Sequence, residues 1–184
     1  LLAGGLDRWK MDKAGGWELK DGVLGTSKTP GGYIWSKDTF ENVEITLEYK
    51  TSAKCNSGLF FRTDPGNAVQ GGFEIQLASD GLYSGKHVVG ALYDAKEPSA
   101  AAGKPDNEWN RMTLTCQGPN ISVVLNGVTV LEADIDEWTT GNENPDGSKN
   151  KFKTALKDLP RRGHLGLQYH GHPVWFRNIK LKKL

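Results

Sequence analysis

The residues best suited to chemistry lie in two short stretches, 57–62 (SGLFFR) and 72–77 (GFEIQL), which alternate as β-strands do. In the second stretch the apolar residues share one face, and Glu74 and Gln76 share the opposite face. In the first stretch, the alternation places Arg62 on the face opposite to Leu59 and Phe61. Thr or Val would suit an exposed strand better. A cation, a carboxylate and an amide on neighbouring strands would form a polar floor suited to a ligand rich in hydroxyl groups.

A third polar face is predicted for residues 163–171 (GHLGLQYHG), in which Leu and Tyr alternate with Gly, Gln and His. If the three stretches share a sheet, one concave face would be lined by Arg62, Glu74, Gln76, Gln168 and His170. The alternative is an ordinary solvent-facing sheet surface. Such surfaces favour Thr, Lys and Glu over Gln and His, so we favour the functional interpretation.

The pair His170 and His172 forms an H-x-H pattern, which on a strand could hold a metal ion. Pro173 follows directly, so His172 is predicted to lie in a turn and to diverge from His170. A third ligand would have to come from farther away: Glu74, His87 or His164. We therefore predict two unrelated histidines at a strand end and no metal site.

Carboxylates are scarce on the predicted strand faces. Ordinary glycosidases place two carboxylates beside the scissile bond, whereas these faces supply only Glu74 clearly. Asp64 and Asp94 are candidates in loops. The sequence also lacks a phosphate-binding glycine motif, C-x-x-C and G-x-S-x-G, so nucleophilic serine chemistry has no support.

Tryptophans could supply a stacking platform for a sugar ring. Trp109 follows a long polar segment and Trp175 lies in the last predicted strand, so either could stack on a sugar. Trp17 and Trp35 are predicted to lie in the core.

The charge balance excludes one class of function. The 184 residues carry 23 Lys plus Arg and 22 Asp plus Glu, a net charge of +1, whereas nucleic-acid binding needs a concentrated basic surface. No apolar run is long enough to span a bilayer.

Cys116 shares a strand face with apolar residues, which favours a buried thiol over a disulfide with Cys55. The chain begins without Met, so we expect a trimmed product, with export as an expectation from composition.

The pattern predicts an all-β sandwich forming a single domain over residues 1–184. Asp21-Gly22 and Asn126-Gly127 are hairpin signals. Two long segments between strands, 80–108 and 134–162, are expected to be functional or disordered, and the second is predicted to hold a helix over 151–159. The predicted strands are 17–19, 23–25, 33–36, 43–50, 57–62, 72–77, 111–116, 121–125, 128–132, 163–170 and 174–181.

Seven motifs in order resemble those of the 3-keto-disaccharide hydrolase domain, a family of glycosyl hydrolases. The motifs are NSGLFFR (56–62), GFEIQ (72–76), GALYD (90–94), EWN (108–110), NGV (126–128), GHLGLQYHG (163–171) and VWFRNIKL (174–181). The resemblance covers nearly the whole chain. It implies a concanavalin A-like jelly-roll β-sandwich of two antiparallel sheets, a carbohydrate substrate, and a periplasmic or extracellular location in a bacterium.

The resemblance also implies a reaction. The ketone of a 3-keto sugar acidifies the C2 proton, so one base can remove it, and the C1 aglycone then leaves by β-elimination before water adds. Glu74 or His170 would be the base, and Tyr93 or Asp94 would assist the leaving group. Arg62 and Gln168 would hold the developing oxyanion. The substrate-binding set is Arg62, Gln76, Tyr93, Asp94, Trp109 and Gln168. No cofactor is implied with certainty; use of a divalent metal ion stays open.

Two other functions are consistent with the same residues. A non-catalytic, lectin-like carbohydrate-binding module would need amides and aromatic rings but no base, so a buried Glu74 with a raised pKa would favour an enzyme. A conventional glycosidase would need a second acid within roughly 5 to 10 Å of Glu74, for which Asp94 is the best candidate. The oligomeric state is not predicted.

Overall fold

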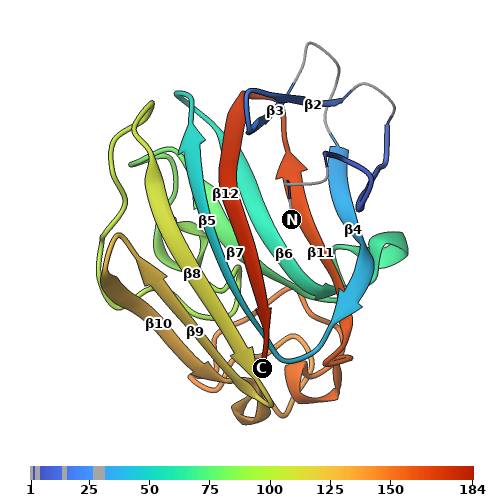
Figure 1. Ribbon diagram of the computed structural model, residues 1–184. Helices are drawn as coiled ribbons and strands as arrows, with labels where there is room; N and C mark the ends of the chain where they lie inside the picture. Colours follow the sequence, from blue (N-terminus) through green and yellow to red (C-terminus); the bar gives the residue numbers. More distant parts are fainter. Residues whose placement is uncertain (1, 3–4, 14–15, 27–31) are drawn as a thin grey trace.

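The computed structural model describes residues 2, 5–13, 16–26 and 32–184, and these fold as two antiparallel sheets packed face to face (Figure 1). The five-stranded sheet has the order β1-β4-β11-β6-β7, and the seven-stranded sheet has the order β10-β9-β8-β5-β12-β3-β2. The arrangement is the predicted all-β, concanavalin A-like jelly-roll sandwich.

The strands follow the alternation of the sequence. The five-stranded sheet consists of β1 (Trp9–Met11), β4 (Gly32–Phe40), β11 (Gly163–Tyr169), β6 (Asn56–Thr63) and β7 (Phe73–Ala78). The seven-stranded sheet consists of β10 (Val128–Asp134), β9 (Asn120–Leu125), β8 (Asn110–Gln117), β5 (Val43–Thr51), β12 (Val174–Lys183), β3 (Val23–Thr26) and β2 (Trp17–Lys20).

The core lies between the sheets, and strands of both sheets contribute side chains to it. In β5 every second residue is buried, so Val43, Ile45, Leu47 and Tyr49 face the other sheet. Because side chains of a strand alternate between faces, burial of one set places the intervening residues on the outer face. The outer faces of the two sheets are therefore available for polar side chains.

Both predicted hairpins are confirmed. Asp21 and Gly22 have φ of 50° and 76°, and Asn126 and Gly127 have φ of 51° and 88°. Positive φ at both central residues is the geometry of the type I′ turn, whose twist matches that of paired strands.

The helix predicted over 151–159 is wrong. Only a single 3-10 turn, η4 (Leu156–Asp158), forms there; the other such turns are η1 (Pro65–Asn67), η2 (Gly85–His87) and η3 (Ile135–Glu137). Phe152, Ala155, Leu156 and Leu159 are buried and have helical spacing, which misled the pattern. The backbone N–H and C=O of Lys151 bond instead to the side chains of Asp94 and Gln70 in other segments.

Both cysteines are buried free thiols, as Cys116 was predicted to be. No helix among the described residues is long and apolar enough to cross a membrane.

Candidate active site on the five-stranded sheet

The outer face of the five-stranded sheet carries the predicted polar residues of β7 and β11. Phe73, Ile75 and Leu77 pack in the core, which leaves Glu74 and Gln76 on the outer face. In β11, Leu165 and Leu167 pack in the core, which leaves Gln168 on the outer face. The strands are in register, because β6 pairs with both β7 and β11 and places Phe60 opposite both Glu74 and Gly166.

Glu74 is the most buried acid of this face, with 7% of its surface exposed. Its side chain lies over Gly58, where a Cβ would meet Oε1 at 2.2 Å. Burial disfavours the charged carboxylate and raises the pKa of Glu74 to about 7, while the ammonium of Lys151 opposes the shift. Lys151 Nζ lies 3.9 Å from Glu74 Oε2. The site therefore holds a carboxyl group that can exchange protons near neutral pH.

Lys151 comes from the long 134–162 segment. Its backbone N–H donates to Asp94 Oδ2, and its carbonyl accepts a 2.8 Å bond from Gln70 Nε2. The ammonium lies 4.6 Å from the centroid of the Tyr93 ring and 5.1 Å from that of Phe152. Burial lowers the pKa of Lys151, and the carboxylates of Glu74 and Asp94 act in the opposite direction. Sequence reasoning missed Lys151, because no strand pattern links it to the sheet.

Tyr93 and Asp94 belong to the other long segment, 80–108, which extends the sheet beyond β7. The Tyr93 N–H donates to the Glu74 carbonyl at 2.9 Å, and the Gln76 N–H donates to the Ala91 carbonyl at 3.0 Å. Asp94 Oδ1 lies 2.9 Å from His87 Nε2, and its Oδ2 accepts the Lys151 N–H. Asp94 thus joins the two long segments, and both of its oxygens have partners.

The amides of Gln76 and Gln168 differ in their partners. Gln76 Nε2 donates to Asn56 Oδ1 at 3.1 Å, while its Oε1 is buried without a hydrogen-bond partner among the described residues. Gln168 Nε2 donates to Tyr33 Oη at 3.1 Å. An unpaired buried acceptor is unfavourable unless a donor reaches it, so the Gln76 oxygen suits a hydroxyl group or water.

Aromatic rings line the face beside Gln168. The rings of Tyr33 and Trp35 stack at 4.9 Å, and Phe60 meets both edge-on. Burial raises the pKa of Tyr33, and the nearby Glu74 carboxylate adds to the shift. Trp35 is buried as predicted, but it lies on this outer face and not between the sheets, whereas Trp17 does pack in the core. Tyr33 was missed because its strand showed no polar alternation.

His170 lies just beyond the end of β11 and is exposed. It shares a shallow pocket with Tyr33, Gln168 and Tyr169, at the margin of the polar face. The ring of His164 bonds to the Ser36 carbonyl at 2.7 Å. In the part of the chain that the structure describes, no three His, Cys, Asp or Glu side chains are grouped to hold a metal.

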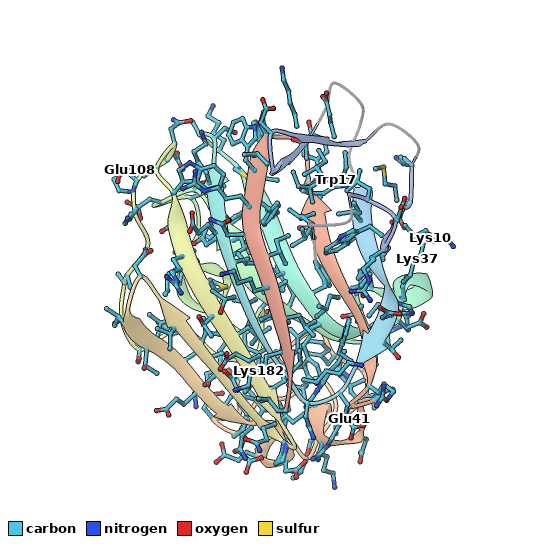
Figure 2. All side chains as sticks on the ribbon, viewed as in Figure 1. Lys10, Trp17, Lys37, Glu41, Glu108 and Lys182 are labelled. Carbon is cyan, nitrogen blue, oxygen red and sulfur yellow. The ribbon has the colours of Figure 1, made fainter. Side chains whose placement is uncertain are left out.

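Arg62 does not join this face, contrary to the predicted alternation. Its φ of 50° coincides with a β-bulge inside β6, and its side chain turns away from this face; the residue is only 2% exposed. It donates to the carbonyls of Glu41 at 3.0 Å and Gly118 at 2.9 Å. Glu41 lies at the end of the sandwich, in the turn between β4 and β5 (Figure 2). Arg62 therefore ties together turns at that end.

Trp109 and Trp175 also lie elsewhere, on the outer face of the seven-stranded sheet. The Arg177 guanidinium stacks 4.0 Å from the centroid of Trp109, and Lys50 Nζ is 4.8 Å from that of Trp175. Neither ring faces Glu74, so the predicted stacking of a sugar on Trp109 would have to occur away from the candidate site.

Solved structures share this architecture. A crystal structure from Parabacteroides distasonis, described as a "putative glycosyl hydrolase", is 36% identical; the match covers 97% of this chain and 95% of that one, with a TM-score of 0.91. The carbohydrate binding module CBM66 of Bacillus subtilis has a TM-score of 0.62 over 96% of each chain. At 13% identity, this second likeness concerns the fold alone.

Sequence comparison is consistent with the first of these likenesses. The 3-keto-disaccharide hydrolase of Bacteroides thetaiotaomicron is 28% identical over an alignment of 202 positions, which covers 95% of this chain and 67% of that protein. The family model for the 3-keto-alpha-glucoside-1,2-lyase-like domain matches residues 3–182. Because that match takes in nearly every residue, including both long segments and the strands that carry Glu74 and Gln168, the chain belongs to the family of 3-keto-alpha-glucoside-1,2-lyase-like domains.

Proposed function

We propose that this protein cleaves 3-keto-glycosides, including 3-keto-disaccharides, by elimination at C1 followed by hydration. The observation that carries the proposal is Glu74, a single buried carboxyl group with a pKa of about 7 on a face lined by amides and aromatic rings. A general base is most effective when its pKa lies near the working pH. Family membership and the named hydrolase relative support a glycosidase-type enzyme.

The reaction needs one base. Glu74 takes the C2 proton, and the electron pair of the broken C–H bond forms a C2=C3 enolate with the charge on O3. The enolate then collapses: the C3 ketone re-forms, a C1=C2 double bond forms, and the C1–O bond to the aglycone breaks. The aglycone oxygen takes a proton. Water finally adds hydroxyl to C1 and hydrogen to C2, so the sum is hydrolysis.

The other residues of the face have supporting roles in the proposal. Gln168 and Gln76 bind hydroxyl groups of the sugar. The phenol of Tyr93 is the proposed proton donor to the departing oxygen; it is protonated at neutral pH, because burial raises its pKa further above the usual value of 10. Asp94 acts indirectly, because His87 and Lys151 already bond to its carboxylate. His170 is exposed at the margin and is a weaker candidate for the base than Glu74.

The alternatives are less well supported. A conventional glycosidase needs a second carboxyl group free to act, and Asp94, the predicted candidate, is bonded through both oxygens. A lectin-like module has no use for a buried carboxyl group whose pKa is near neutrality. Export to the periplasm or the cell exterior stays a prediction from the sequence.

The experiment that tests the proposal compares a 3-keto-disaccharide with its unoxidised parent, with and without chelator, for the wild type and Glu74→Gln. We expect cleavage of the keto sugar alone and no cleavage by the variant. Cleavage of the parent sugar would indicate a conventional glycosidase. Binding of either sugar without cleavage would indicate a carbohydrate-binding module, and loss of activity with chelator would add a metal ion.

A further inference from the structure

We propose that Lys151 is a second catalytic residue, whose ammonium group binds the C3 ketone oxygen of the sugar and stabilises the enolate. The inference rests on the function proposed above and adds a role that the sequence did not suggest. Proton removal from C2 places a full negative charge on O3, and catalysis requires a donor fixed where that charge develops. Among the described residues, Lys151 is the basic residue that forms an ion pair with Glu74.

The spacing of the two groups suits the reaction. Lys151 Nζ lies 3.9 Å from Glu74 Oε2, which is too far for a direct hydrogen bond and near enough for both groups to touch one small ligand. In a ketone, the α-carbon and the oxygen are roughly 2.4 Å apart, as standard bond lengths dictate. A base about 3 Å from C2 and a donor about 3 Å from O3 therefore fit side by side over one C2–C3 unit.

Lys151 is held in place without using its ammonium hydrogens. The backbone bonds to Asp94 and Gln70 fix the residue, and the Tyr93 and Phe152 rings flank the ammonium. No hydrogen bond from Nζ is found within the described part of the chain. The lysine side chain is also more exposed than that of its partner, 21% against 8%, so part of it is open to solvent. Its N–H groups can therefore reach a ligand.

Donor and acceptor positions would also orient the sugar. A ketone oxygen only accepts hydrogen bonds, so it is attracted to the ammonium of Lys151, which only donates. Gln76 Oε1, two residues from Glu74 on the same face of β7, has no hydrogen-bond partner among the described residues, so it suits a hydroxyl group but not a ketone. The carbon that bears the ketone would thus lie toward Lys151, with hydroxyl groups toward Gln76.

A partial reaction tests this role apart from departure of the aglycone. The probe is the 3-ketone of 1,5-anhydroglucitol, which has hydrogen in place of the exocyclic C1 oxygen substituent, so it can form the enolate but has no aglycone to lose. Exchange of its C2 proton in deuterated water is followed by NMR. The proteins are the wild type, Lys151→Met, Lys151→Arg, Glu74→Gln, and Lys153→Met as a matched control with an exposed lysine two residues away.

We expect Lys151→Met to slow exchange about 100-fold, as loss of one oxyanion donor typically does, while Lys153→Met exchanges like the wild type. Lys151→Arg keeps a cation, so its exchange rate should lie between those of Lys151→Met and the wild type. Where the Met variant fails to fold, Lys151→Gln keeps the length and a neutral donor. If Lys151 acted only on the leaving group, exchange by Lys151→Met would match the wild type while cleavage slowed, and the proposal would be overturned.

The pH dependence separates a direct role from pKa tuning. The titratable groups facing Glu74 and Lys151 are each other, Tyr33, Tyr93 and Asp94. Removing the ammonium removes the influence that lowers the pKa of Glu74, so the rise in rate should move to higher pH. With a direct role, the plateau at high pH stays low; recovery of the wild-type plateau would overturn the proposal. Exchange lost in Glu74→Gln but kept in Lys151→Met would leave the proposed function standing, whereas no exchange by the wild type would remove both.

Discussion

The Glu74 carboxylate occupies the space where residue 58 would carry a Cβ. Glu74 and Gly58 lie on paired strands, and a Cβ on residue 58 would be 2.2 Å from Oε1 and 2.8 Å from the carboxyl carbon. The strand partner of Gly58 is Gln76, so the glycine allows the Glu74 side chain to lie flat across the sheet. The orientation of the proposed base therefore depends on the absence of a side chain on the neighbouring strand.

Gly58→Ala should reduce activity while keeping every functional group. The added methyl group would push the carboxylate off the sheet, and a displacement of about 1 Å in such a site can reduce the rate about 100-fold. We expect a fall mainly in kcat, measured on a 3-keto-disaccharide. A kcat equal to that of the wild type would show that the observed position of Glu74 is not the reactive one.

Glu74→Gln should abolish turnover and stabilise the fold at neutral pH. The pKa of Glu74 rises from 4.5 to about 7 on folding, so the folded state resists ionisation that the unfolded chain undergoes. The destabilisation is absent below pH 4.5, grows between pH 4.5 and 7, and is constant above. The shift corresponds to about 3 kcal/mol as an upper value. Urea unfolding at pH 4 and pH 8 measures it; an equal difference between variant and wild type at both values would contradict the assignment.

The rate of the wild type should rise with pH through about 7. The base acts as a carboxylate, so kcat/KM should follow the ionised fraction of Glu74, with one proton lost. Initial rates from pH 5 to 9 test this, with the integrity of the substrate checked in protein-free samples, since keto sugars eliminate spontaneously in base. A profile that is flat from pH 5.5 to 8 would point to a different base.

Arg62→Leu should affect stability and not the chemical step. The guanidinium is buried and donates to the carbonyls of Glu41 and Gly118, which would lose their donor. Leaving such groups unpaired costs about 1–3 kcal/mol each. We expect a lower unfolding midpoint, with kcat unchanged for the folded fraction. A normal midpoint with reduced kcat would restore Arg62 to the catalytic groups, as the strand alternation first suggested.

The two thiols should be unreactive in the folded protein. Burial raises the pKa values of Cys55 and Cys116 to about 12, and the thiolate is the reactive form. We expect a thiol reagent to label neither residue until denaturant is added, and reductant to leave the unfolding temperature unchanged. Rapid labelling at pH 7.5 would contradict the described packing around them.

The sequence predicts the fold well because alternation and turn chemistry are local. Residues 43–50 alternate strictly, and Asn126-Gly127 requires a tight turn, so strands and hairpins follow without knowledge of the partner strands. The family motifs add the jelly-roll architecture. The faces of β7 and β11 also follow from alternation, which brings Glu74, Gln76 and Gln168 to one surface.

The remaining site residues depend on features that alternation does not encode. The positive φ of Arg62 turns its side chain away from the predicted face, and the sequence pattern around it does not indicate this conformation. Lys151 reaches Glu74 through contacts between two irregular segments, 77 positions from Glu74 in the chain. The helical spacing of Phe152, Ala155 and Leu156 reflects burial of separate anchors, which a periodicity argument cannot distinguish from a helix.

The bond between Lys151 and Asp94 has a consequence for the order of folding. Glu74 is placed by a strand within the sandwich, but its cationic neighbour is placed only when the 80–108 and 134–162 segments have docked on each other. Closing two long loops is slow, because the chain loses conformational entropy before the contacts between distant residues stabilise it. During refolding, recovery of far-ultraviolet circular dichroism should therefore precede recovery of turnover, and a chain with a complete sandwich would still be inactive for a time.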